Sequence, residues 1–229
     1  MSMSLNFTGE TRQGRIALQA SIDALVIAGW TGRDAAAVEE HIAELERLGV
    51  ARPKTTPIFY RVAAALLTTA DAIEVAGNDS SGEVEPVVLN LAGRLWIGVG
   101  SDHTDRKIET IGVTLAKQLC AKPVGPVLWP LDEVAPHWDR LVLRSHAIVG
   151  GGRRRYQEGP VARLRPPEEL MRRFGGAAAL APGIAMFCGT LAVEGGIAPA
   201  ERFEIELEDP VLGRKIAHAY AITPLPVEG

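Results

Sequence analysis

Two carboxylates in the middle of the chain have a spacing that could serve chemistry. Glu83 and Glu85 lie two residues apart at the start of an expected strand. Side chains two apart in a strand share one face, and this face continues with Val87 and Leu89. The face therefore points toward a core. Two carboxylates there repel each other and lose hydration, so they require a cation or protons.

Asp102 supplies a third carboxylate at the end of the next expected strand. A hairpin turning at 91–93 would put Asp102 opposite Glu83, with about 5.5 Å between the facing Cβ atoms. Three oxygen donors suit a hard divalent ion, Mg²⁺ or Mn²⁺, with Ca²⁺ as an alternative and water filling the remaining positions. His103 is expected to be structural, because adjacent strand or turn residues point apart. The competing interpretation is a solvated acidic hairpin, and Pro86 favours an edge strand or a bulge.

The elements that position these residues are expected to be mostly short strands. The chain contains 24 Gly and 15 Pro, spread along its length as in a fold with many turns. Two or three strands are expected within 5–28. The other expected strands are 58–61, 73–76, 83–89, 94–99, 140–149, 154–165, 184–191, 203–208 and 214–222. Glu204, Glu206 and Glu208 alternate on one of them and are expected to form a solvated face.

Three helices are expected among these strands, at 34–48, 105–119 and 168–174. The first follows a capping-box pattern at 31–34 and carries apolar residues at helical spacing. The second is expected to bury one apolar face. The residues of that face are Ile108, Ile111 and Leu115. The fold class is therefore α+β and β-rich, and no linker divides residues 1–229 into two domains.

The composition is that of an ordinary globular protein. The chain has 229 residues, 47% of them apolar and 23% charged, with a net charge of −4. A mildly acidic chain without a basic face is a poor candidate for binding nucleic acid or anionic membranes. Two cysteines, no secretory signal pattern and no apolar run of about 20 residues predict a cytoplasmic protein.

The order of short motifs along residues 25–222 resembles the fumarylacetoacetate hydrolase superfamily. Each motif is weak alone, and the six in sequence carry the resemblance. They are His41-Ile42-Ala43-Glu44, Pro57-Ile58-Phe59-Tyr60-Arg61, Glu83-Val84-Glu85, Ser101-Asp102-His103-Thr104-Asp105-Arg106, Lys117 before Pro123-Val124-Gly125-Pro126, and Leu180-Ala181-Pro182-Gly183 with Gly189-Thr190.

This resemblance implies a mixed β-sandwich roll or distorted β-barrel with a few peripheral helices, N-terminal strands in 1–24, and a homodimer. It implies a Mg²⁺ or Mn²⁺ ion held by Glu83, Glu85 and Asp102. The implied activity is that of a metal-dependent hydrolase or lyase. Its substrate would be a small 2-oxo or β-dicarbonyl carboxylic acid, cleaved at a C–C bond by acylpyruvate-type hydrolysis or by decarboxylation.

The resemblance also implies roles for residues outside the metal triad. His41 and Glu44, three apart on one helix, would orient and deprotonate an attacking water. Lys117 and Arg106 would supply positive charge for a substrate carboxylate or a developing oxyanion. The implied substrate contacts are Arg61, Glu109 and Thr190.

Several positions depart from the pattern of that superfamily. Ser101 stands where Asn is usual, Asp105 where Ala is usual, and Arg61 where Lys is usual. These departures indicate a divergent branch. They leave open two alternatives, a non-catalytic protein that binds a small acid, and a keto–enol isomerase or hydratase.

Overall fold

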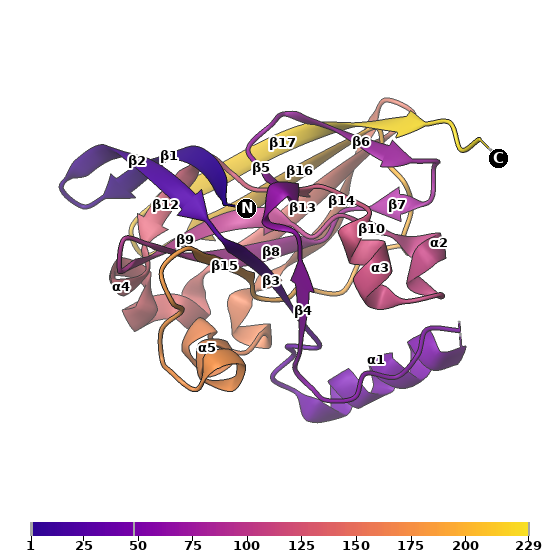
Figure 1. The fold of residues 1–229 in the computed structure, drawn as a ribbon, viewed down its shortest axis with the longest axis horizontal. Coiled ribbons are helices and arrows are strands. Elements are labelled where there is room, and N and C mark those ends of the chain that lie inside the picture. The colour runs from indigo at the N-terminus through magenta and orange to yellow at the C-terminus, as the bar shows by residue number, and fades with distance from the viewer. Residues whose placement is uncertain (1, 48, 229) are drawn as a thin grey trace.

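Two β-sheets form the body of the protein, and the helices lie around them (Figure 1). The computed structural model describes residues 2–47 and 49–228. The larger sheet is a curled, mixed, eight-stranded sheet. Its strands in spatial order are β2 (Gly14–Ile22), β1 (Met3–Thr11), β12 (Val127–Pro130), β9 (Arg94–Ser101), β8 (Val84–Leu91), β15 (Ile184–Phe187), β3 (Ala24–Gly29) and β4 (Ile58–Val62).

The second sheet has five strands and covers one face of the first at β8 and β9. In spatial order they are β14 (Gly152–Pro160), β13 (Val142–Val149), β16 (Arg202–Asp209), β17 (Arg214–Leu225) and β6 (Ala72–Ala76). Two short pairs complete the strands of the described residues. They are β7 (Ser80–Ser81) with β10 (Thr104–Asp105), and β5 (Leu67–Thr68) with β11 (Lys122–Pro123).

Alternation along β8 separates two apolar clusters. Val84 and Val88 pack between the two sheets, together with residues such as Phe203 of β16. Val87 and Leu89 belong to a second cluster on the opposite face of the large sheet. The β-rich α+β fold predicted from the sequence is confirmed, and so is the face on which Glu85 lies.

The long helix α1 (Ala35–Arg47) lies outside the sheets, as predicted (Figure 1). Leu48, the last residue of the predicted helix, lies outside the described residues. The predicted cap is wrong by three residues, because Asp34 Oδ1 accepts the Ala36 and Ala37 amides whereas Thr31 is buried upstream. The shorter helices α4 (Leu131–Val134) and α5 (Pro167–Gly175) cover another part of the molecule.

The helix predicted at 105–119 is two helices, α2 (Arg106–Glu109) and α3 (Val113–Gln118). The chain breaks before α3 at Gly112, a residue with low helix propensity. The predicted burial of the apolar face is also wrong, since Ile111 is 73% exposed and Leu115 is 56% exposed. The buried residues of α3 are instead Ala116 and Lys117, so this helix directs a lysine toward the interior.

Pro86 lies in a central strand, so the predicted edge or bulge is wrong. The Asp102 amide donates to the Glu83 carbonyl, so the polar groups of residue 83 face β9. Because these directions alternate, the nitrogen of Pro86 faces β15 at the end of that ladder, where the Cys188 amide donates to the Pro86 carbonyl. Pro86 has no N–H to return this bond, so the proline costs the ladder one terminal hydrogen bond. In the described residues, no helix is both long and apolar enough to cross a membrane.

Candidate metal centre

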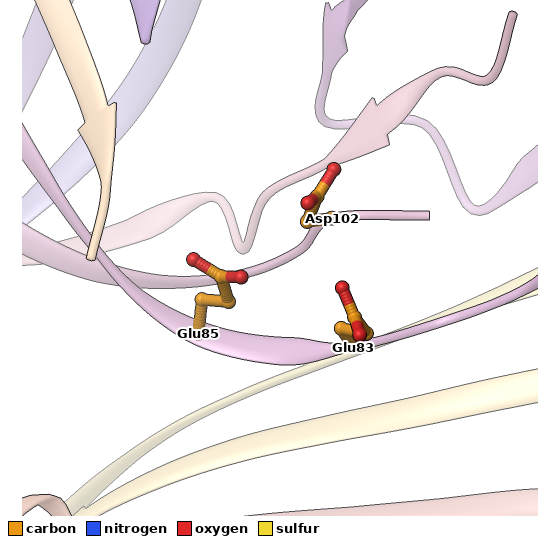
Figure 2. Close-up of side chains that lie close together, drawn as sticks. All are labelled: Glu83, Glu85 and Asp102. Carbon is orange, nitrogen blue, oxygen red and sulfur yellow. The ribbon is translucent and has the colours of Figure 1, made fainter. Parts of the chain in front are cut away.

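The three predicted carboxylates converge at the end of the β8–β9 hairpin. Glu83, Glu85 and Asp102 each offer an oxygen, and these oxygens lie within 4.8 Å of one another. Figure 2 shows the three side chains close together, with Glu85 on β8, Glu83 just before it and Asp102 just after β9. The predicted register is confirmed, because Val84 pairs with Ser101 and the Asp102 amide donates to the Glu83 carbonyl over 2.9 Å.

Two glycines next to Glu85 stand where a side chain would collide with neighbouring residues. Gly100 pairs with Glu85 across the hairpin, and a Cβ at Gly100 would lie 2.6 Å from Phe187. Gly189 has φ 97° and donates its amide to Glu85 Oε2 over 2.6 Å. A Cβ at Gly189 would lie 1.7 Å from the Thr31 hydroxyl. Both positions therefore require glycine. The Gly189 amide fixes one Glu85 oxygen, and the Glu85 residue is only 2% exposed.

Two lysines neutralise part of this cluster. Lys117 Nζ donates to Asp102 Oδ2 and lies 3.7 Å from Glu83, while Lys122 Nζ lies 3.2 Å from Asp102 Oδ1. Burial alone would raise the pKa of Asp102, but the two ammonium groups lower it below its usual range. Burial alone would lower the pKa of Lys117, and the Asp102 and Glu83 carboxylates raise it instead.

In the part of the chain that the structure describes, Glu85 forms no ion pair with a lysine or arginine. Burial first, and then the charges of Asp102 and Glu83, raise its pKa well above the usual range. A divalent cation between the carboxylates would remove this cost. Asp102 Oδ1 is buried and accepts no hydrogen bond within the described residues, although Lys122 Nζ lies 3.2 Å from it. These all-oxygen donors fit Mg²⁺, Mn²⁺ or Ca²⁺.

Arg106 and Glu109 extend the cluster on α2. The Arg106 guanidinium lies 3.2 Å from Glu83 and 3.1 Å from Glu109, and its Nε donates to Ser81 over 2.7 Å. Burial alone would lower the pKa of Arg106, and the two carboxylates raise it. Arg106 and Glu109 therefore lie beside the triad, where the resemblance expected them.

The other predicted residues lie differently. His41 Nδ1 and Glu44 Oε2 are 3.4 Å apart on α1, with side chains 60% and 55% exposed. Arg61 is exposed on β4, next to the buried Tyr60. No hydrogen bond joins any of these three to the triad within residues 2–47 and 49–228. Thr190 lies close by, but its hydroxyl already donates to the Val84 carbonyl over 2.8 Å.

Sequence reasoning missed three buried residues at this site. Lys122 is fully buried and also donates to the His103 and Cys120 carbonyls, but a lone Lys in a sequence predicts an exposed side chain. Tyr60 lies below Lys117, whose Nζ is 5.9 Å from the ring centroid. Gln157 bonds to the Val84 amide from the second sheet. Its position just after Tyr156 in a strand gave no signal.

His103 is structural, as predicted. Its Nδ1 lies 3.0 Å from the Tyr220 hydroxyl and its Nε2 2.9 Å from the Ser80 hydroxyl. Burial, with the charges of Lys122 and Arg106, lowers the pKa of His103 to about 3. Both ring nitrogens are used, so the imidazole takes no part in the triad.

Comparison with known proteins assigns the chain to a family. Residues 28–220 match the model of a family described as a protein of unknown function, DUF2848. The chain belongs to the DUF2848 family. No curated protein matches the sequence of this DUF2848 protein significantly.

Solved structures share the fold of this DUF2848 protein at low identity. One is a yeast fumarylacetoacetate hydrolase family protein, with 14% identity and a TM-score of 0.63 over 90% of this chain and 95% of that one. A second is 2-keto-3-deoxy-D-arabinonate dehydratase complexed with magnesium and 2,5-dioxopentanoate, with 15% identity and a TM-score of 0.63 over 89% and 74% of the two chains.

A third is 4-oxalocrotonate decarboxylase from Pseudomonas putida G7, complexed with calcium and acetate. It shares 16% identity and has a TM-score of 0.54 over 86% of this chain and 76% of that one. The fold expected from the motif order is thus confirmed for this DUF2848 protein, whose family match indicates a divergent branch.

Proposed function

We propose that this protein is a divalent-metal-dependent hydrolase or lyase that cleaves a C–C bond of a small 2-oxo or β-dicarbonyl carboxylic acid. The observation that carries the proposal is the buried cluster of Glu83, Glu85 and Asp102, with oxygens within 4.8 Å of one another. Structural neighbours that contain magnesium or calcium with small oxo or carboxylic acids support it.

The ion, when bound, would act as a Lewis acid for the keto oxygen and the enolate that forms when the bond breaks. Lys117 and Arg106 contribute positive charge to this otherwise acidic site, in addition to that of Lys122. Lys117 is fixed against Asp102, and Arg106 is held between Glu83 and Glu109, so both cations are oriented before any substrate binds. A substrate carboxylate at the triad would meet these two side chains first. Glu109 acts by holding Arg106 in place.

Hydrolysis needs an attacking water in addition to these groups. We assign the activation of this water to His41, whose imidazole Glu44 would orient. The two side chains are paired and open to solvent on α1. Decarboxylation, dehydration and keto–enol isomerisation share the enolate and need no such water. The dehydratase among the structural neighbours supports a dehydratase as the alternative activity.

Two measurements on the purified protein test the proposal. Isothermal titration calorimetry with Mn²⁺ and Mg²⁺ should show one site, absent in Asp102→Asn. Acylpyruvates, oxaloacetate and a 2-keto-3-deoxy acid should then be followed by loss of substrate and by product analysis with Mn²⁺ present. Cleavage of an acylpyruvate or oxaloacetate supports the proposal, and water loss alone supports the dehydratase.

Binding of an oxo acid without turnover would support a non-catalytic binding protein. Absence of metal binding in the wild type would overturn the metal centre itself. We also propose that the protein is a cytoplasmic homodimer whose substrate is a small carboxylic acid. Light scattering coupled to gel filtration tests the dimer.

A further inference from the structure

Three hydrogen bonds close a ring around the peptide between the two glutamates. The Val84 amide donates to Gln157 Oε1 over 3.0 Å. Gln157 Nε2 donates to the Thr190 hydroxyl over 2.7 Å, and this hydroxyl donates to the Val84 carbonyl over 2.8 Å. Val84 and Gln157 are completely buried, so water does not compete for these bonds.

The ring stands where the sheet provides no ladder. The polar groups of Val84 face away from β9, toward β15. The ladder from that side ends as the Cys188 amide donates to the Pro86 carbonyl. Two residues further back along β8, the side chains of Gln157 and Thr190 replace the missing strand. Without them, both polar groups of Val84 would be buried and unpaired.

A β-bulge turns Gln157 toward this position. Ser145 pairs with Gln157 but His146 pairs with Arg155, so Tyr156 is an extra residue in β14. Tyr156 and Gln157 are therefore both buried, although neighbouring strand residues normally alternate. Bulges re-aim side chains in this way and often lie next to active sites.

Every hydrogen-bonding position of the Gln157 amide is used. Its Nε2 also donates to the Leu191 carbonyl over 2.6 Å, and its Oε1 also accepts the Ser145 hydroxyl over 3.0 Å. The amide can therefore not rotate without breaking several buried bonds. Rotation of the Val84 peptide would displace Glu83 and Glu85 together, since Val84 lies between them.

We propose that Gln157 is a positioning residue for the metal centre, and that Thr190 acts with it by holding the Val84 peptide, not by contacting substrate. This inference rests on the metal site of the proposed function. It assigns a role to the second sheet, which supplies none of the carboxylates. Side chains that fix metal ligands in this way typically change metal affinity by about 10- to 100-fold when removed.

The test compares Mn²⁺ dissociation constants by calorimetry in five proteins: wild type, Gln157→Met, Thr190→Val, Thr190→Ser and Ser145→Ala. Gln157→Met keeps the volume and removes the ring, and Thr190→Val removes the hydroxyl alone. Both should raise the dissociation constant about 10- to 100-fold. Thr190→Ser keeps the hydroxyl and should bind like the wild type. Ser145→Ala removes a bond to the same Gln157 oxygen outside the ring, and is the matched control.

The energetic coupling between Gln157→Met and Thr190→Val distinguishes a positioning role from a general loss of stability. The double variant Gln157→Met/Thr190→Val should bind Mn²⁺ about as weakly as either single variant, because all three lose the same ring. Hydrogen exchange of the Val84 amide without metal should speed up in Gln157→Met and stay unchanged in Ser145→Ala. This second readout works even if a variant binds no ion.

Each contrary outcome has its own meaning. If the wild type binds Mn²⁺ and Gln157→Met binds it equally well, the inference is overturned while the proposed function stands. If Thr190→Val changes only the affinity for an oxo acid, Thr190 is a substrate contact and the inference is overturned for that residue. If the wild type binds no ion, the proposed function fails, and exchange at Val84 alone decides whether the ring holds the peptide.

Discussion

Replacing Glu85 by Gln should affect the metal-free and the metal-loaded protein in opposite directions. Carboxylate oxygens of the triad lie within 4.8 Å of one another. At an effective dielectric constant of about 20, two unit charges at that distance repel by about 3.5 kcal/mol. Lys117 offsets part of this repulsion at Asp102 and Glu83, and the Gly189 amide can donate to the Gln oxygen as it does to Glu85.

We therefore expect Glu85→Gln to stabilise the metal-free protein by about 1–2 kcal/mol, at the lower end of the gains seen when buried charges are removed. For a chain of this size that is a rise in Tm of about 2–8 °C. Saturation of the wild type with Mn²⁺ at about 100 times Kd should add about 2.7 kcal/mol, and the variant should show almost no response.

Differential scanning fluorimetry with EDTA and then with Mn²⁺ measures both effects. Glu74→Gln is the matched control, because Glu74 is an exposed carboxylate on β6 and should leave both melting temperatures unchanged. A metal-free Glu85→Gln that melts several degrees below the wild type would refute the claim that the three carboxylates repel. A variant that keeps the full Mn²⁺ response would remove Glu85 from the site.

Three further predictions follow from single side chains. Lys117→Met should lower the free energy of unfolding of the metal-free protein by about 1.5–3 kcal/mol in urea titrations, because the buried Asp102 loses the nearer of its two cations and keeps only Lys122, and Mn²⁺ should restore part of the loss. His41→Ala should change stability by less than about 0.5 kcal/mol and Mn²⁺ affinity not at all, yet lower hydrolytic turnover by about 10²–10⁴, and unchanged turnover would leave Lys117 and Arg106 as the catalytic candidates. Burial alone would raise the pKa of Asp209, but hydrogen bonds from His137 and the Leu212 amide and the charge of Arg214 lower it. The ionised Asp209 therefore stabilises the fold above the ordinary aspartate pKa near 3.9, and this stabilisation is lost as the pH falls through the lower pKa of the folded state. The stability difference between wild type and Asp209→Asn, about 1–3 kcal/mol at neutral pH, should therefore shrink between pH 5 and pH 2, and a constant difference would contradict the assigned charge.

Local spacing predicted the carboxylate site because the geometry of a hairpin follows from its turn. Alternation placed Glu83 and Glu85 on the face of Val87, and the turn at 91–93 fixed the register that brings Asp102 opposite Glu83. These relations involve neighbouring strands only. Pattern and physical chemistry are sufficient for them.

Relations between distant segments could not be predicted in the same way. Helical spacing shows that Ile108, Ile111 and Leu115 share a face, but not whether anything covers that face, and Ile111 and Leu115 are exposed. Lys122 and Gln157 acquire their partners only when the two sheets pack. The residue types at these two positions do not indicate which distant residues they will contact.

The order of strands in the large sheet has a consequence for how the chain reaches its native state. β3 pairs in parallel with β15, which joins residues 24–27 to residues 184–187. The Gly189 amide that holds Glu85 follows directly after β15. Loop closure over such a separation is slow, so sheets of this kind fold in milliseconds to seconds. During synthesis, the acidic hairpin should therefore emerge from the ribosome well before its last anchor, and remain without a fixed ligand geometry until residue 189 has left the exit tunnel.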